Sequence, residues 1–303
     1  MNISILITQM IILFLLIGCG YICSKCNLIT QEHIPFLSKV VLNLGIPAAI
    51  LSSVSNGTSL NPKELVINIA GFFLFNVLCA LFSKLVVKVL GITNDKKLYE
   101  FMYMFSNIAF MGLPVVQAVL GDRAMIYATL FLLPSNLVLF SYGENLMRDT
   151  REFSLKKFFN PAIIASILAI IVCVINYRPP YIITKTLVYL GNITTPLAMV
   201  IIGVSLGNVS IWKMFKNKEM LVFLIVKMIV LPLIYWKILN SLNINEIITS
   251  MLVLLMAMPI PSNAVVYASI YKKNIGLATQ ASVLTSIVSV FSIPIVFLII
   301  SIL

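Results

Sequence analysis

The stretch Met256–Tyr271, MAMPIPSNAVVYASIY, decides the fold that we expect for this chain. Together with the apolar residues before it, the stretch is long enough to cross a membrane, yet Pro259 and Pro261 interrupt it. Neither proline has an N–H, and each ring clashes with the preceding turn, so a regular helix cannot run through both. Ser262 and Asn263 can then begin a new half-helix with free N–H groups. An ordinary proline kink is the competing interpretation, but a double break followed by Ser-Asn favours a substrate site.

A related stretch lies about half the chain earlier. Met111–Thr129 (MGLPVVQAVLGDRAMIYAT) aligns without a gap on Pro261–Thr279 (PSNAVVYASIYKKNIGLAT). The matches at nearly the same offset are Val115-Val116 with Val265-Val266, Ala128-Thr129 with Ala278-Thr279, Asn43 with Asn192, Pro47 with Pro196, and Ser135-Asn136 with Thr285-Ser286. Each match is weak by itself, because apolar helices resemble one another by chance. Their shared offset indicates an internal duplication.

The composition is that of an all-α membrane protein with many spans. Of the 303 residues 60% are hydrophobic and only 10% are charged, and the mean hydropathy is +1.06. Apolar runs of spanning length recur along the chain. We expect ten transmembrane helices, near residues 3–23, 34–55, 64–90, 98–119, 121–147, 160–176, 181–207, 218–239, 246–271 and 275–302. The first is expected to be a retained helix, because no basic segment or cleavage site accompanies it.

The basic residues predict the orientation in the cell membrane. With ten spans, the loops near residues 25, 84–97, 148–157, 213–218 and 272–273 lie on one side and hold most of the lysines and arginines. That side is expected to be cytoplasmic, so both termini face outward. A repeat of five helices is odd in number and must invert the second copy. We therefore expect one five-helix repeat over 1–147, a short cytoplasmic linker over 148–159 and an inverted repeat over 160–303.

Several classes of function are disfavoured. The net charge of +11 resides in short loops without a basic domain, so we expect no nucleic-acid partner. His33 is the single histidine, which leaves no Ser-His-Asp constellation, and no Gly-Lys-Ser/Thr loop exists to bind ATP. Cys23, Cys26 and His33 are one ligand short of a zinc site and poorly spaced. We expect no enzyme activity, no metal and no cofactor.

Charged residues are scarce at the predicted membrane centre. The acidic residues fall near helix ends or in loops, so coupling is expected to come from protons carried by the substrate, from the membrane potential or from Na⁺ held by neutral oxygens. Lys227 lies deep in the eighth helix. It either snorkels or bonds neighbouring carbonyls, or it places a fixed positive charge beside an anion path.

Neutral polar groups and prolines supply the candidate substrate site. A centre of amide side chains and two half-helix N-termini suits a carboxylate. Asn76, away from the breaks, is expected to matter much less. The candidate substrate-binding residues are Asn107, Gly112, Pro114, Pro259, Pro261, Ser262, Asn263, Asn43, Pro47, Thr195, Pro196, Asn136 and Lys227.

These residues resemble the auxin efflux carrier family, in particular its short prokaryotic members, over essentially the whole chain. Asn107-Ile-Ala-Phe110-Met-Gly112-Leu-Pro114, with Gly121 downstream, looks like the N-x-x-F-x-G-x-P…G pattern of that family. The ninth segment and the last helix resemble the family at Pro259, Asn263, Ala268 and Pro294, and further matches fall at Pro47, Asn160-Pro161 and Pro196–Gly203. Each motif is loose, but their order and spacing together are fairly specific.

The resemblance implies a ten-helix inverted-repeat fold similar to bile-acid symporters and sodium/proton antiporters. In that fold helices four and nine cross at their broken centres. Helices one, two, six and seven form a scaffold, and the others form a moving bundle. Prokaryotic relatives are described as permeases for malate, malonate and similar organic anions, and plant relatives export auxin. This chain lacks the long cytoplasmic loop and the Asn-Pro-Asn-x-Tyr break of the plant proteins, which argues against auxin as its substrate.

The leading expectation is a secondary transporter of small organic anions such as malate or malonate. The alternatives are a sodium-coupled carrier of a larger amphipathic acid and a membrane sensor that keeps the fold without moving solute. The expected partners are a small carboxylate, the lipid bilayer, and H⁺ or Na⁺ as the coupling ion. The sequence leaves open the substrate, the direction of transport and the oligomeric state, a homodimer included.

The predicted orientation can be tested in the linker between the repeats. A cysteine introduced as Ser154→Cys should react with a membrane-impermeant thiol reagent only after the cells are permeabilised, because the linker is predicted to be cytoplasmic. Labelling of this cysteine in intact cells would contradict the orientation.

Overall fold

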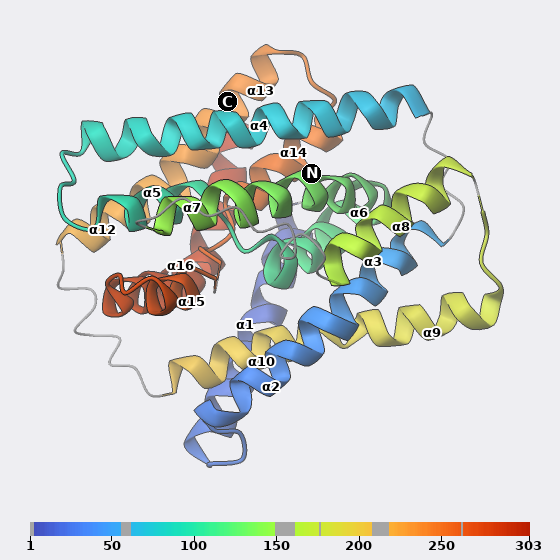
Figure 1. Cartoon of the computed structure of the whole chain (residues 1–303), viewed down its shortest axis with the longest axis horizontal. Helices are drawn as coiled ribbons and strands as arrows, with labels where there is room; N and C mark the ends of the chain where they lie inside the picture. The colour runs from blue at the N-terminus through green and yellow to red at the C-terminus, as the bar shows by residue number, and fades with distance from the viewer. Residues whose placement is uncertain (1–2, 56–61, 149–160, 176, 208–217, 262) are drawn as a thin grey trace.

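The computed structural model describes residues 3–55, 62–148, 161–175, 177–207, 218–261 and 263–303 (Figure 1). Within these ranges the chain is helical and contains no strand. In the described part of the chain, six helices are long and apolar enough to cross a membrane: Gln31–Val54, Val66–Val89, Leu113–Met147, Tyr181–Leu206, Lys218–Ser241 and Ile275–Ile302. The expectation of an all-α membrane protein is confirmed. The count of ten spans and the inverted repeat stay predictions.

The first half of the described chain holds helices that are repeatedly interrupted. Its elements are α1 (Ile3–Lys25), η1 (Gln31–His33), α2 (Ile34–Val40), η2 (Val41–Gly45), α3 (Ile46–Val54), α4 (Pro62–Val89), α5 (Lys96–Met104), η3 (Ile108–Gly112), α6 (Leu113–Val138), η4 (Leu139–Gly143) and α7 (Glu144–Met147). Inside α6, Gly121 has φ 78° and ψ −176°, so two helices meet there at a kink that favours glycine.

The second half shows a similar pattern. Its elements are α8 (Pro161–Val174), α9 (Tyr181–Asn192), α10 (Thr194–Leu206), α12 (Lys218–Ile225), η6 (Val226–Val230), α13 (Leu231–Ser241), α14 (Glu246–Met256), α15 (Asn263–Ile270) and α16 (Ile275–Ile302).

Prolines mark three of the interruptions. Pro47, Pro114 and Pro232 lie in the first turn of α3, α6 and α13, and each of these helices is preceded by a π-helical turn. Proline has no N–H to donate to the preceding turn. The π-helical turn ends just before it, so the proline stands in the first turn of the next helix, where an N–H is not needed. The prolines in the sequence thus determine where a π-helical turn gives way to a new α-helix.

Two helices break completely. α5 ends at Met104, and Phe105 is extended, with φ −98° and ψ 145°, before η3 starts at Ile108. α14 ends at Met256 and is followed by non-helical backbone over 257–261, and α15 starts at Asn263. The second break includes Pro259 and Pro261, as the opening stretch of sequence predicts.

The helices pack in two groups. α1 lies along α10, and α3 packs on α8 and α9. In the other group α4 packs on α5 and α6, α14 packs on α6 and α13, and α15 packs on α16. Figure 1 shows α4 across the upper part of the view and α9 with α10 across the lower part.

Burial differs sharply between α14 and α4. From Met251 to Met256 every residue of α14 is buried, so this apolar helix lies at the centre. α4 is also largely apolar but exposes large side chains such as Leu74 and Leu81, which are 70% and 60% exposed. A helix that is apolar on all sides belongs either in a core or against lipid. α14 lies in the core, and the exposed apolar surface of α4 suits contact with lipid.

A polar cluster joins the end of α7 to the end of α15. The Arg148 guanidinium donates to the Tyr271 hydroxyl at 2.9 Å and pairs with the Glu144 carboxylate at 2.5 Å. The Tyr271 hydroxyl also donates to Glu144. The hydrogen bond with Tyr271, together with Glu144, raises the pKa of Arg148 above its ordinary value. The cluster ties these two helix ends together.

The packing of α1 on α10 should depend on Gly20. A Cβ at this position would lie 2.2 Å from the backbone oxygen of Val200, whereas a Cβ at Gly18 would meet nothing within 4 Å. We expect Gly20→Ala to lower the melting temperature in detergent by roughly 5 °C or more, because overpacking costs about 1–3 kcal/mol. Gly18→Ala is the matched control on the same helix. Equal melting temperatures for the two variants would contradict this packing.

Candidate functional site

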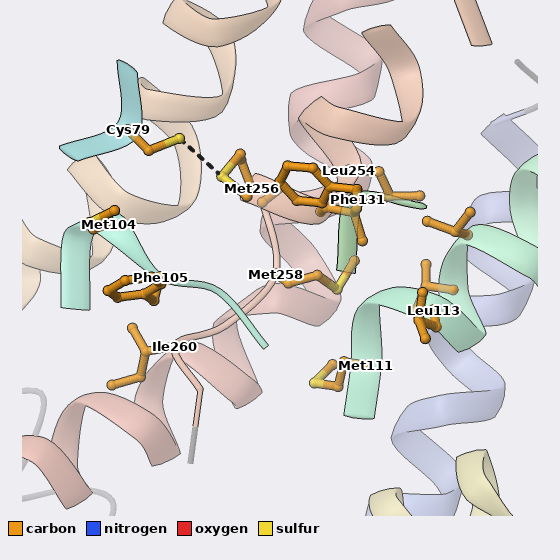
Figure 2. Close-up of a cluster of buried hydrophobic side chains, with 14 of the residues drawn as sticks. Cys79, Met104, Phe105, Met111, Leu113, Phe131, Leu254, Met256, Met258 and Ile260 are labelled. Carbon is orange, nitrogen blue, oxygen red and sulfur yellow. Dashed lines mark hydrogen bonds between the residues drawn. The ribbon is translucent and has the colours of Figure 1, made fainter. Parts of the chain in front are cut away.

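The two breaks cross each other at the centre of the molecule. Figure 2 shows the extended backbone that follows Met104 beside the extended backbone that follows Met256, with Phe105, Met258 and Ile260 around them. The backbone N–H of Asn107 donates to the carbonyl oxygen of Pro259 at 2.7 Å. One short hydrogen bond thus joins the broken fourth segment to the broken ninth segment.

Side chains satisfy more of the backbone that the breaks expose. The Ser106 hydroxyl donates to the carbonyl oxygen of Met256 at 3.2 Å. The backbone N–H of Ile260 donates to the Thr285 hydroxyl at 3.3 Å. Buried peptide groups without partners cost free energy in a membrane. These bonds explain how non-helical backbone is tolerated here.

The start of η3 is built on the carbonyl of Asn107. Its oxygen accepts from the N–H groups of Gly112, at 3.0 Å, and Met111, at 3.4 Å. Gly112 lies against α14, where an added Cβ would be 2.6 Å from the Leu255 side chain. Pro114 follows in the first turn of α6. In this pattern Gly112 and Pro114 shape the backbone, and Gly112 permits the close approach of α14.

A cavity of about 390 Å³ adjoins the crossing, and it brings five of the candidate residues together. They are Asn43, Asn107, Asn136, Pro261 and Asn263, which come from η2, from both breaks, from α6 and from the start of α15. We call this space the amide cavity. Its other described lining residues are mostly apolar, and no Asp, Glu, Lys, Arg or His is among them. The cavity can recognise a ligand by hydrogen bonding and shape, and it offers no acid–base pair for catalysis.

A second cavity, of about 490 Å³, is lined by three further candidates: Pro114, Thr195 and Pro196. We call it the hydroxyl cavity, because its polar lining is Ser52, Ser53, Gln117, Asp122, Asn192, Thr194 and Thr195. Along η2 and α3, and again from η3 to the kink at Gly121 in α6, the lining of the amide cavity comes first and that of the hydroxyl cavity follows; beyond Gly121 the order along α6 is reversed. The two cavities therefore lie at different depths. Ile46 and Ala109 line both.

Four candidates line neither cavity. Gly112 and Pro259 build the crossing itself, and Pro47 begins α3. The Lys227 ammonium faces the backbone carbonyls of the fourth segment instead of either cavity. This is the carbonyl-bonding alternative of the sequence analysis. Ser262 lies outside the residues that the structure describes.

Sequence reasoning missed four polar residues of the amide cavity: Asn76, Ser106, Ser135 and Tyr267. Asn76, expected to lie apart from the site, donates to the Ser135 hydroxyl at 3.3 Å. The expectation that it is remote was wrong, because the packing of α4 on α6 brings it to the cavity. The buried Tyr267 hydroxyl has no hydrogen-bond partner within the described part of the chain. The sequence shows that Asn76 is an amide deep in a predicted helix. It does not show in which direction the side chain points.

No metal site emerges from the described residues, in which no three His, Cys, Asp or Glu side chains cluster. The chemistry available at the crossing is that of amides, hydroxyls and helix ends. The starts of η3–α6 and of α15 flank the amide cavity and carry the partial positive charge of helix N-termini. Helix N-termini in general attract anions rather than cations.

Comparison with known proteins gives two findings. The family described as "Membrane transport protein" matches residues 5–155 and 150–297. An uncharacterized transporter of Methanocaldococcus jannaschii is 24% identical over 310 aligned residues, which cover 93% of this chain and 95% of that protein.

The asparagines of the two breaks should be needed for ligand binding. We expect Asn107→Leu and Asn263→Leu each to weaken binding of a carboxylate ligand about ten- to a hundredfold, because hydrogen bonds to a charged group contribute roughly 1.5–3 kcal/mol. Ligand-dependent shifts of the melting temperature measure this. Asn240→Leu, which lies outside both cavities, is the control. Wild-type binding by both folded variants would place the ligand elsewhere.

Proposed function

Because the chain belongs to the membrane transport protein family, the auxin efflux carrier family that its motifs resemble, we propose that it is a secondary transporter of small organic anions. In this proposal it works by alternating access in the cytoplasmic membrane, and the substrate binds at the crossing of the broken helices. Malate, malonate and similar carboxylates are the proposed substrates.

The observation that carries the proposal is the pair of cavities at different depths. The amide cavity and the hydroxyl cavity approach each other at the crossing and share the lining residues Ile46 and Ala109. A solute that passes between them needs only a local change at these side chains and at the breaks. Alternating access requires two cavities, each reached from one side of the membrane, with a barrier between them that can open.

The proposed architecture is a pair of five-helix repeats, 1–147 and 160–303, joined by the linker 148–159. The repeats are inverted, and both termini face outward. The family match in two stretches that meet near residue 150 supports this division. The two packing groups support a scaffold of the first, second, sixth and seventh segments and a moving bundle of the others. In this arrangement the crossing moves with the bundle.

The preference for an anion rests on helix ends and amides. Two helix N-termini adjoin the amide cavity, while no described acidic side chain lines it to repel a carboxylate. Asn43, Asn107, Asn136 and Asn263 supply amide groups around the same space. Such donors stabilise an anion without the cost of burying a full cation beside it.

One observation favours a second candidate, a carrier of a larger amphipathic acid. Leu42, Phe140, Leu139 and Val266 contribute to a lining of the amide cavity that is mostly apolar. A dicarboxylate gains nothing from such walls, whereas an acid with an apolar body buries surface against them.

Uptake into proteoliposomes tests the proposal and separates the candidates. Labelled malate and labelled phenylacetate should be offered to purified protein under an imposed membrane potential and under a proton gradient. Saturable malate uptake supports the first candidate, and uptake of phenylacetate alone supports the second. A protein that binds either acid but moves neither across the membrane is a sensor.

The barrier between the cavities yields a further prediction. We expect Ala109→Phe to reduce transport by about tenfold or more while binding in detergent falls much less, because a bulky ring fills the narrow space between the two cavities. Ala118→Phe is the matched control, since Ala118 is exposed on α6, which directly follows η3, and lines neither cavity. Equal transport by the two variants would show that solute does not pass Ala109.

A further inference from the structure

Lys227 is the one lysine or arginine that is buried among the residues that the structure describes. Its exposed fraction is 1%, and it lies on the π-helical turn η6. A charge at this depth is costly unless it has partners, and intramembrane charges are usually functional. The partners of Lys227 therefore decide what it does.

The ammonium has three oxygen acceptors. Nζ lies 3.0 Å from the carbonyl oxygen of Tyr103, 3.1 Å from that of Phe105 and 3.0 Å from the hydroxyl oxygen of Ser106. The Ser106 proton is directed to the carbonyl oxygen of Met256, so the hydroxyl can only accept from Nζ. A neutral amine has two N–H groups, and three acceptors require three. The three acceptors match the three donors of a charged ammonium.

These acceptors belong to the broken end of α5. Tyr103 lies in its last turn, and Phe105 and Ser106 lie in the extended backbone that follows. The last carbonyls of a helix have no intrahelical donors and carry partial negative charge. Through Ser106 the same ammonium reaches the end of α14 at Met256. Lys227 thus holds the fourth segment, and through it the ninth, at the crossing.

Three neutral oxygens at the C-terminal end of a half-helix, beside unwound backbone, are the ligand set on which transporters coordinate a coupling cation. Here the lysine side chain occupies that position. We propose that the Lys227 ammonium is a tethered substitute for a coupling cation. It completes the crossing without an ion from solution, so transport requires neither Na⁺ nor K⁺. This inference rests on the proposed transport function and removes sodium from its candidate coupling ions.

The first test uses the wild-type protein. Its carboxylate uptake should change less than about twofold when Na⁺ and K⁺ are replaced by choline on both sides of the membrane, a factor that corresponds to a negligible coupling free energy. Uptake that requires Na⁺ overturns the proposal.

The second test removes the tethered charge. Lys227→Ala should lower uptake in choline chloride by about tenfold or more, because carbonyls at the crossing lose a charged donor. Na⁺, K⁺ or n-propylammonium, which replaces the deleted atoms, should restore a large part of the activity. Lys227→Met fills the space without charge and should not respond to any of these cations. Lys237→Ala, which removes an exposed lysine on α13, should behave as wild type.

A third measurement does not depend on transport. The melting temperature of Lys227→Ala in detergent should rise when choline is replaced by Na⁺, K⁺ or n-propylammonium, and that of wild type and of Lys227→Met should not. If Lys227→Ala folds only in the presence of one of these cations, the recovery of folded protein is the same readout. No cation response in a folded Lys227→Ala overturns the proposal. A cation response together with no uptake by wild type instead refutes the transport function and leaves the tethered cation intact.

Discussion

The hydrogen bond from the Asn107 N–H to the Pro259 carbonyl is the contact on which the central architecture depends. Two helices that break inside a membrane expose peptide groups that lipid cannot satisfy. Each break supplies what the other lacks: one offers an N–H and a hydroxyl, and the other offers carbonyls. Neither break could exist alone at this depth. The crossing is therefore a single unit, although its halves lie about half the chain apart in the sequence.

The crossing also separates opposite charges. Its helix N-termini adjoin the amide cavity, whereas the C-terminal end of α5 faces the Lys227 ammonium. The positive helix N-termini thus face the proposed anion. The negative C-terminal end of α5 is neutralised by the Lys227 ammonium of the protein itself. This arrangement allows an anion site without a cation or a carboxylate among the described residues that line it. It also gives a buried lysine a purpose that does not require contact with the substrate.

The position of the barrier follows from the same geometry. Ile46 and Ala109 lie where η2 gives way to α3 and within η3, beside interruptions caused by Pro47 and Pro114. π-Helical turns and prolines weaken the regular hydrogen-bond ladder, so these are places where a helix changes direction at low cost. The two cavities meet at such points. A barrier placed there can open through small changes of the backbone, and the packed group of α1, α3 and α10 need not unfold.

The sequence by itself determined the all-α membrane fold, the helix break at Pro259 and Pro261, and four of the five amide side chains that line the amide cavity. Long apolar runs leave no other fold class, and paired prolines cannot be accommodated in a regular helix, so these features follow from local chemistry. Asn43, Asn107, Asn136 and Asn263 were predictable because deep amides are rare in membrane helices. Only the tertiary structure decided which side of each helix faces the cavity. A helix that is apolar all round gives no amphipathic signal for its rotation. For that reason Asn76 and Tyr267 were missed, and the sequence left open whether Lys227 faces an anion path or bonds backbone carbonyls. The positions of these three side chains depend on packing between segments that are distant in sequence, which no local pattern encodes.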